Sequence, residues 1–165
     1  MSILPEKSMH NRERGFTLVE TLVSMAVLTM GIIPALALSN NAVSVAFVIR
    51  DDLIAAGLAQ EGIEVVQAIR DDNWLNNRPF DTGLSDGDYQ LEWDSTSLST
   101  FSGGPLKVDN GLYNYSSGTA SPFTRDIIIT KVNDGELKVV SRITWQTRTN
   151  DAKTTSAEEH LFNWK

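Results

Sequence analysis

One apolar run limits what this chain can fold into more than any other feature. Residues 16–38 read FTLVETLVSMAVLTMGIIPALAL and contain one ionisable side chain, Glu20. At about 1.5 Å rise per residue, a helix over this run is roughly 30 Å long, which matches the hydrocarbon core of a bilayer. Basic residues precede the run, and Asp51 and Asp52 follow it. The positive-inside rule therefore predicts a membrane-spanning helix with a cytoplasmic N-terminus and an exported remainder.

Three ordinary explanations of the run compete. A secretory signal peptide places small residues at a cleavage site after its apolar segment, and Ala35-Leu36-Ala37 fits that pattern. A single-pass anchor requires only the length. A buried helix of a soluble protein conflicts with an apolar surface on all sides. None of the three gives Glu20 a role, although a carboxylate in hydrocarbon costs about 2.5–3.5 kcal/mol and persists where it has a partner or a function.

The residues around the start of the run form a more specific pattern. Arg12-Glu13-Arg14-Gly15 followed by Phe16-Thr17-Leu18-Val19-Glu20 resembles the recognition sequence of type IV prepilins and pseudopilins. The resemblance implies a leader over residues 1–15, cleavage after Gly15 by a prepilin peptidase, and N-methylation of Phe16. It also implies that the new amine of Phe16 meets Glu20 of a neighbouring subunit in a filament, where pairing offsets the cost of burying each charge. We therefore expect Glu20 to set the register of assembly.

A second helical segment is predicted over residues 39–77. Apolar residues recur there at roughly helical spacing, at Phe47, Ile54, Leu58, Val65 and Ile69. This spacing predicts one buried face and an end near Asp71–Asn77, before Arg78-Pro79. A helix over residues 16–72 would be roughly 80–85 Å long, far beyond a globular average. The transmembrane or assembly half, 16–38, and the amphipathic half, 39–77, together predict a pilin-like spine.

Glycine and proline interrupt the first half of this spine. Gly31 and Pro34 predict a helix break, which is either a kink of the kind that membrane helices tolerate or, as the family resemblance suggests, a segment that melts when the subunit stretches in a filament. Further along, Gly57 and Gly62 indicate close contact with a sheet or a second weak point. The triplet Arg-Asp-Asp occurs at 50–52 and again at 70–72, which indicates surface charge or ion pairs between subunits.

Residues 78–165 have the composition of an antiparallel sheet. Strands are predicted over 88–94, 106–108, 112–115, 123–132, 137–149 and 155–164, with surface loops over 94–105 and 116–122. The turns at Asp109-Asn110-Gly111 and at residues 133–136 predict two hairpins. Alternation places Val139, Ser141, Ile143 and Trp145 on one face, and Trp93, Trp145 and Trp164 are expected in the core or at its rim. One long helix followed by this sheet predicts an α+β fold with the sheet packed on the helix.

Several chemical functions are not supported by the sequence. The chain has 165 residues, no cysteine and a net charge of -7. It therefore has no disulfide or Cys-ligated metal, and direct nucleic-acid binding is not predicted. The only histidines are His10 and His160, and the sequence has no P-loop, HExxH or GxSxG motif. We predict no catalytic residue, no cofactor and no enzymatic activity.

Two acidic clusters were considered as metal sites. Asp81, Asp86 and Asp88 lie near Gly83 and Gly87, but their spacing does not match the EF-hand template, and Asp-Gly clusters usually form turns. Residues 158–160 read Glu-Glu-His on a predicted strand, where neighbours face opposite ways. No metal site is predicted. Residues 114–116, Asn-Tyr-Ser, match a glycosylation sequon, which is a frequent chance match.

Together these features predict a structural subunit of a type IV pilus-like filament, either a PilV-type minor pilin or a pseudopilin. Its predicted partners are a prepilin peptidase, other pilin subunits, the inner-membrane assembly machinery and, before assembly, membrane lipid. It would be a single-pass protein of the cytoplasmic membrane and later part of an extracellular or cell-envelope filament. The alternative is an exported binding module or adhesin, tethered or secreted through a conventional anchor or signal sequence.

Overall fold

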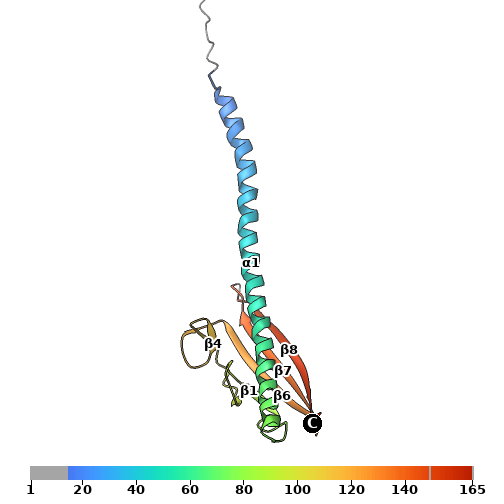
Figure 1. Cartoon of the computed structure of the whole chain (residues 1–165). Helices are drawn as coiled ribbons and strands as arrows, with labels where there is room; N and C mark the ends of the chain where they lie inside the picture. Colours follow the sequence, from blue (N-terminus) through green and yellow to red (C-terminus); the bar gives the residue numbers. More distant parts are fainter. Residues whose placement is uncertain (1–14, 149, 165) are drawn as a thin grey trace, which may run out of the picture. The chain divides into compact units, whose positions relative to one another are not determined.

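The computed structural model describes residues 15–148 and 150–164 (Figure 1). Its helix is α1 (Leu18–Leu75). Its strands are β1 (Gly87–Gln90), β2 (Ser99–Thr100), β3 (Lys107–Asp109), β4 (Leu112–Asn114), β5 (Thr119–Ala120), β6 (Phe123–Asn133), β7 (Glu136–Gln146) and β8 (Ala152–Phe162). One long helix followed by antiparallel strands confirms the predicted α+β class and is consistent with a pilin-like fold.

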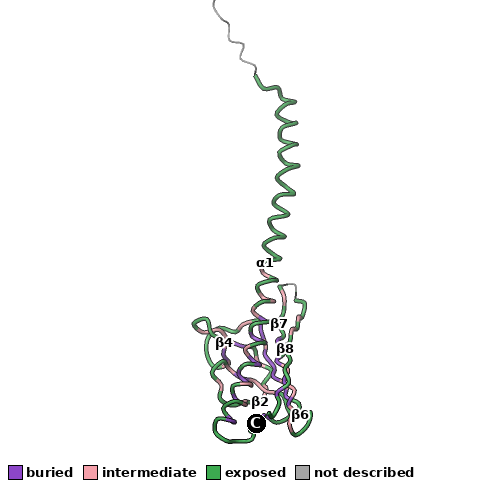
Figure 2. The backbone as a smooth tube through the Cα atoms, turned by 45° about the vertical axis from the view of Figure 1, so that its right-hand side comes forward, coloured by how far each residue is buried: buried purple, intermediate pink, exposed green. Residues whose placement is uncertain are grey.

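The chain divides into two compact units, and the boundary lies between Val45 and Ala46. In the first unit, every described residue is exposed, and those from Leu18 onward are helical (Figure 2). The helix continues through Gly31 and Pro34. Proline has no N–H to donate, so the helical hydrogen bond to the carbonyl of Met30 cannot form there. Melting of this segment inside a filament is a property of an assembly and stays a prediction.

In the second unit, the C-terminal part of α1 packs on the sheet. Its buried residues recur at helical spacing: Ala55, Leu58, Ala59, Gly62, Ile63, Val65, Val66, Ile69, Asn73 and Trp74. The predicted buried positions Leu58, Val65 and Ile69 are confirmed, whereas Phe47 and Ile54 are only partly buried. Burial therefore begins well inside the predicted amphipathic half. Each fully buried aliphatic side chain contributes about 1.5–3 kcal/mol.

The main sheet has five strands in the order β2-β1-β6-β7-β8, and a smaller sheet has the order β4-β3-β5. Both predicted hairpins are confirmed. In the β3–β4 hairpin, Asp109 lies opposite Leu112, and Asn110 and Gly111 both have positive φ, 51° and 84°. This is the conformation that favours Asn-Gly. The longer hairpin joins β6 to β7, where Asn133 lies opposite Glu136.

The face of the sheet that packs against α1 carries the predicted apolar alternation. On β7, Val139, Ser141, Ile143 and Trp145 are at most 4% exposed. At Gly62 the helix lies close to this face, because a Cβ there would be 2.3 Å from the Oγ of Ser141. The expectation of close helix-to-sheet contact is thus confirmed at Gly62. At Gly57 it is wrong, because nothing lies within 4 Å of an added Cβ.

The first predicted strand is wrong in its second half, because β1 ends at Gln90 and not at Asp94. The carbonyl of Leu91 accepts a hydrogen bond from Nη2 of Arg125 at 2.7 Å, and the N–H of Glu92 donates to Oγ of Ser95 at 2.8 Å. These bonds satisfy the main chain outside the ladder, so the strand stops. Trp93 is consequently half exposed.

Other boundaries also differ from the predictions. The two predicted loops each contain a two-residue strand, β2 and β5. β8 begins three residues earlier than predicted and ends two residues earlier. β7 ends at Gln146, and its predicted end at Thr149 lies outside the described residues. Of the last two tryptophans, Trp145 is buried, whereas Trp164 is 71% exposed and contacts Trp74 edge to face.

Candidate functional site

The first turn of α1 is closed by its own side chains. The backbone N–H of Glu20 donates to Oγ1 of Thr17 at 3.3 Å, which makes Thr17 the N-cap residue. Glu20 occupies the third helical position, so residues 17–20 have the Thr-x-x-Glu pattern of a capping box. A carboxylate is also favoured near the positive end of the helix dipole. The sequence reasoning missed this cap at Thr17, although the Thr-x-x-Glu signal was present.

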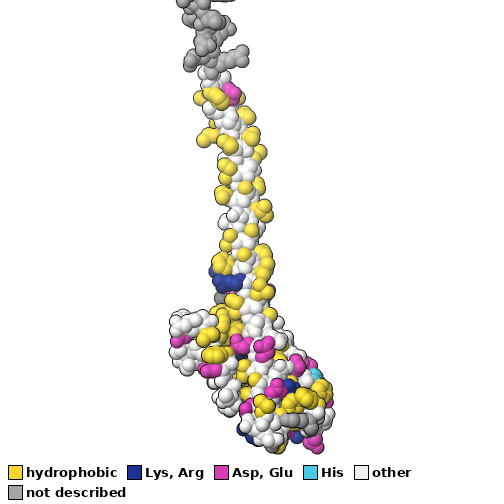
Figure 3. Space-filling view, viewed as in Figure 1, with side chains coloured by type: hydrophobic (Ala, Val, Ile, Leu, Met, Phe, Trp, Pro, Cys, Tyr) yellow, Lys and Arg dark blue, Asp and Glu magenta, His cyan; other side chains and the backbone are white. Residues whose placement is uncertain are grey.

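The helix from Leu18 to Val45 presents an apolar surface that no other described residue covers. Large apolar side chains are 53–77% exposed at Leu18, Val19, Leu22, Val23, Met25, Val27, Leu28, Met30, Ile32, Ile33, Leu36, Leu38, Val43 and Val45. Figure 3 shows hydrophobic side chains along this part of the helix. So large an exposed patch is the mark of a membrane or protein contact. By length and composition, α1 is the one helix in the described residues that is suited to cross a membrane.

Two threonine hydroxyl groups within this surface are satisfied locally. Thr21 donates to the carbonyl of Leu18 at 2.8 Å, and Thr29 donates to the carbonyl of Ala26 at 2.9 Å. Such bonds to the preceding turn remove the need for water as a partner. Glu20 is the one ionisable residue between residues 15 and 49. Within this segment an ionisable group therefore occurs only in the first turn of the helix.

The predicted cleavage residues lie just before the helix. Gly15 and Phe16 are exposed and not helical, and no atom lies within 4 Å of where a Cβ on Gly15 would be. The rest of the predicted leader, residues 1–14 with His10, lies outside the described residues. Cleavage at Gly15 and methylation of Phe16 therefore remain predictions.

The acidic cluster that was considered for calcium has partners within the protein. Asp81 lies 3.4 Å from Nζ of Lys131, and Asp86 accepts a hydrogen bond from the backbone N–H of Lys131. Between residues 15 and 164, Thr149 excepted, no three His, Cys, Asp or Glu side chains are placed to hold a metal.

His160, the histidine of the other acidic cluster, lies close to Glu136, with its Nδ1 2.6 Å from Oε1. The sequon residue Asn114 is buried, and its Oδ1 accepts from the N–H groups of two following serines.

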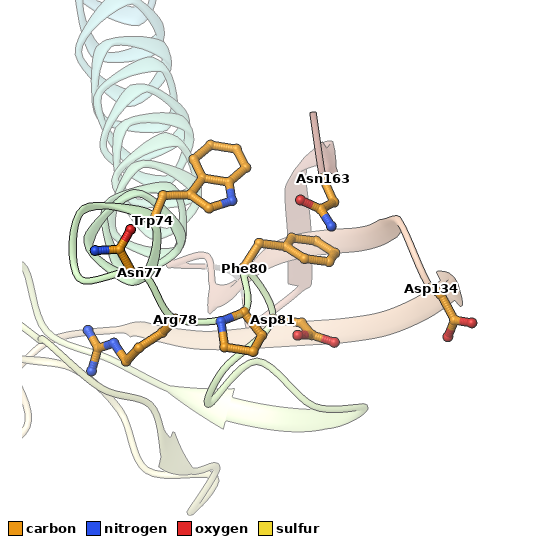
Figure 4. A pocket seen from close by; sticks show the side chains of 8 residues that line it. Trp74, Asn77, Arg78, Phe80, Asp81, Asp134 and Asn163 are labelled. Carbon is orange, nitrogen blue, oxygen red and sulfur yellow. The ribbon is translucent and has the colours of Figure 1, made fainter. Parts of the chain in front are cut away.

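A hollow of about 550 Å³ lies near the end of α1 (Figure 4). Its polar side chains do not converge. Asn77 and Arg78 point to one side and Asp134 to the other. Arg78 also forms an ion pair with Asp72. We therefore find no binding constellation in this hollow.

The repeated Arg-Asp-Asp triplets are paired within the chain. Arg50 contacts Asp51 and Arg70 contacts Asp71, each at 2.8 Å. In both triplets the arginine also lies over an aromatic ring one helical turn away, Phe47 for Arg50 and Trp74 for Arg70. Internal contacts thus account for these arginines without a neighbouring subunit.

A buried arginine joins the helix to the sheet, and the sequence reasoning missed it. Arg125 is 0% exposed, and its Nη1 lies 2.7 Å from Oε1 of Glu61 on α1. Its Nη2 donates to the carbonyl of Leu91, and its own carbonyl accepts from the hydroxyl of Tyr115 at 3.0 Å. Burial raises the pKa of Tyr115 above its ordinary value. The signal was a charged residue at an inward position of β6, between Phe123 and Ile127.

Comparison with known families places the functional signal at the N-terminus. The prokaryotic N-terminal methylation motif matches residues 10–36. No curated protein and no solved structure matches the chain. The chain therefore carries the leader signature of type IV prepilin-like proteins, which supports a type IV pilin-like or pseudopilin precursor. The proteins that carry this motif are structural, and the motif implies a prepilin peptidase and other pilins as partners. Together with the exposed apolar helix, it fits a membrane-anchored precursor.

Proposed function

We propose that this protein is a minor pilin or pseudopilin, a structural subunit of a type IV pilus-like filament. In this proposal, residues 1–15 are removed, Phe16 becomes an N-methylated terminus, and residues 16–38 hold the subunit in the cytoplasmic membrane. Inner-membrane machinery then transfers it into a cell-envelope or extracellular filament with other pilins. The observation that carries the proposal is the methylation motif at 10–36, whose residues 18–36 belong to α1, where the apolar side chains are exposed.

The proposed assembly follows from the cost of the exposed surface. Before assembly, lipid covers the apolar side chains of residues 18–38; in a filament, the same side chains pack against other helices. A carboxylate in that packed core needs a partner. The amine of Phe16 on an adjacent subunit supplies one, so Glu20 fixes how far one helix is displaced along the next. The capping bond from Glu20 N–H to Thr17 uses the backbone and leaves the carboxylate available.

The first experiment determines the mature N-terminus by tandem mass spectrometry of protein made in a host with a prepilin peptidase. We expect N-methylated Phe16, and we expect Gly15→Val to retain the leader because a β-branched side chain obstructs the scissile bond. Gly57→Ala, a change in open space on the same helix, is the matched control and should be processed normally. A terminus at Leu38 would favour the exported binding module, and an uncut chain would favour a simple anchor.

The second experiment separates assembly from processing. Glu20→Ala and Glu20→Gln should both be cleaved and methylated, yet they should be strongly depleted from sheared filaments. Ser24→Ala, one turn further along the exposed helix, should enter filaments at the normal level. Incorporation of Glu20→Ala at the wild-type level would rule out a register role for Glu20 while leaving the processing result intact.

A further inference from the structure

The outer strand of the main sheet has one unpaired side. β8 pairs with β7 over its whole length, from Ala152 opposite Gln146 to Phe162 opposite Glu136, without a register shift. It is the last strand in the sheet order, and Figure 1 shows it at the outer edge. An edge strand presents a row of free N–H and C=O groups that can template another strand.

The backbone groups that face outward can be assigned from the two ends of the strand. The N–H of Asn163 donates to the carbonyl of Gly135, and the carbonyl of Asp151 accepts from the N–H of Thr147. Odd-numbered residues therefore point their backbone groups toward β7. Because this direction alternates along a strand, the even-numbered residues 152–162 point theirs away from the sheet. In the described part of the chain, no backbone group bonds to those of residues 154–160 on this side.

This edge lacks several of the usual protections against pairing. Natural edges are blunted by proline, bulges, extreme shortness or charged side chains, and of these β8 has only charges, at Lys153, Glu158 and Glu159. β8 has 11 residues, no proline and no bulge, and its centre, residues 154–157, reads Thr-Thr-Ser-Ala. The opposite edge of the same sheet is β2, which has two residues. β8 is thus the one long open edge among the described strands.

We propose that β8 pairs with β8 of a second copy of this chain, antiparallel and centred on Ser156. A two-fold axis makes such a contact self-complementary. In this register Lys153 lies directly opposite Glu159 of the second copy, and the same pair occurs twice. Opposite charges at facing positions stabilise a sheet, and like charges destabilise it.

The neighbouring registers are less favourable. Centring the pair on Glu158 or on Glu159 places each of these carboxylates against itself. Centring it on Thr155 places Glu159 opposite Asp151, and centring it on Ala157 leaves the charges opposite neutral residues. The Ser156 register is therefore the one among these that pairs opposite charges.

Both members of the proposed pair are accessible. The side chain of Lys153 is 38% exposed and lies 3.0 Å from Asp52 of its own chain. An ammonium group has three donors, so Lys153 can contact a second carboxylate. Glu159 is exposed and has no ion pair with any residue between 15 and 164 that the structure describes.

The symmetry determines how two copies would meet. A two-fold axis perpendicular to the sheet continues it across the dimer and makes the packed segments of α1 antiparallel. The proposed contact involves residues of the second unit alone. It does not depend on cleavage at Gly15, so failure of either idea leaves the other intact.

Cysteine cross-linking of the full chain in detergent tests the contact, because the natural chain has no cysteine. Facing residues of a hydrogen-bonded antiparallel pair have Cα atoms about 5.5 Å apart, within the range of a disulfide. Ser156→Cys should form a disulfide dimer on mild oxidation. Ser97→Cys, an exposed loop serine, is the matched control. Equal yields from the two variants, as association through the apolar helix would give, would overturn the proposal.

Charge reversal then tests the register. In the Ser156→Cys chain, Glu159→Lys places a lysine opposite Lys153 in each of the two symmetric pairs and should lower the dimer yield about tenfold. Adding Lys153→Glu recreates both pairs with their signs exchanged and should restore the yield. Tryptophan fluorescence confirms that each variant is folded before oxidation. The register is wrong if Glu159→Lys leaves the dimer yield unaltered. It is also wrong if adding Lys153→Glu does not raise the yield above that of Glu159→Lys alone.

Discussion

The two ends of α1 form one uninterrupted helix but meet opposite surroundings. Between Leu18 and Val45 no residue is buried, although the side chains are mostly apolar. Between Ala55 and Trp74 ten residues are buried against the sheet. The second stretch interleaves its apolar residues with Gln60, Glu64, Arg70 and Asp71, so it has a polar side for water. Periodicity, more than apolar content, thus separates a helix that packs on its own chain from one that needs lipid or a partner.

Two spectroscopic probes can follow these regions separately. All four tryptophans, at positions 74, 93, 145 and 164, lie in the second unit. Tryptophan fluorescence therefore reports on the packed region alone, whereas far-UV circular dichroism also reports on the exposed helix. The predictions below use this difference, and each is measured by denaturant unfolding of the full chain in detergent.

The largest effect is expected at the buried arginine. Arg125→Leu leaves the carbonyl of Leu91 and the carboxylate of Glu61 without their donor. Removing one partner of a buried pair costs about 3–5 kcal/mol, and the low end applies because the side chain of Glu61 is 35% exposed. Arg78→Leu breaks an ion pair on the surface and should change the free energy of unfolding by less than about 1 kcal/mol. If both variants lowered the free energy of unfolding equally, Arg125 would not join the helix to the sheet.

A matched pair of leucines on α1 tests the difference between the exposed and the packed part of the helix most directly. Leu58→Ala, at a side chain that is 4% exposed, should lower the unfolding free energy by about 2–5 kcal/mol as seen by tryptophan fluorescence. Leu28→Ala, at a side chain that is 60% exposed, should leave that transition unchanged. If Leu28→Ala shifted the fluorescence transition as far as Leu58→Ala, the two regions would not be separate.

The two glycines of the packed segment should respond with opposite sign. At Gly62 a new Cβ would lie 2.8 Å from Cδ1 of Ile127 and 3.1 Å from Cβ of Ser141, so Gly62→Ala should destabilise the protein by about 1–3 kcal/mol. Gly57→Ala meets no atom and should stabilise the helix by up to about 1 kcal/mol. Thermal unfolding of both variants, followed by fluorescence, measures the contrast. A stabilising Gly62→Ala would mean that the helix does not lie this close to the sheet.

The smallest effect is a dependence on alkaline pH. Burial raises the pKa of Tyr115 above its ordinary value of about 10. Between the unfolded and the folded pKa, the unfolded chain binds fewer protons than the folded one, so stability falls as the pH rises through this window. Tyr115→Phe should cost about 1 kcal/mol at neutral pH, through loss of the hydrogen bond to Arg125, and should flatten the alkaline decline. If stability fell with alkaline pH as steeply in Tyr115→Phe as in the unaltered protein, groups other than Tyr115 would cause the fall.

Local signals predicted most of the fold. Periodicity predicted α1 and the β6–β7 pair, and turn chemistry predicted the Asn110-Gly111 hairpin. The failures involve contacts between distant residues. β1 stops at Gln90 because Arg125, 35 positions away, binds the next carbonyl, and no local pattern encodes that bond.

The candidate site was predictable for a different reason. Gly15, Phe16 and Glu20 form a contiguous pattern with fixed offsets, so the motif could be found without a fold. The Thr17 cap is equally local and was missed because Glu20 had been assigned only an intersubunit role. The open edge of β8 could not be predicted, because strand order determines which strand is outermost.

The position of Thr17 has a consequence for proteolysis. Because the helix is capped there, the bond between Gly15 and Phe16 lies in non-helical backbone, ahead of the first hydrogen-bonded turn. A peptidase that acts at this bond can bind an extended substrate without first unwinding α1, so the stability of the helix does not enter the cost of cutting. The cap also stays with the mature chain, which would begin one residue before it. Cleavage at the proposed site would therefore leave the helix and its cap intact.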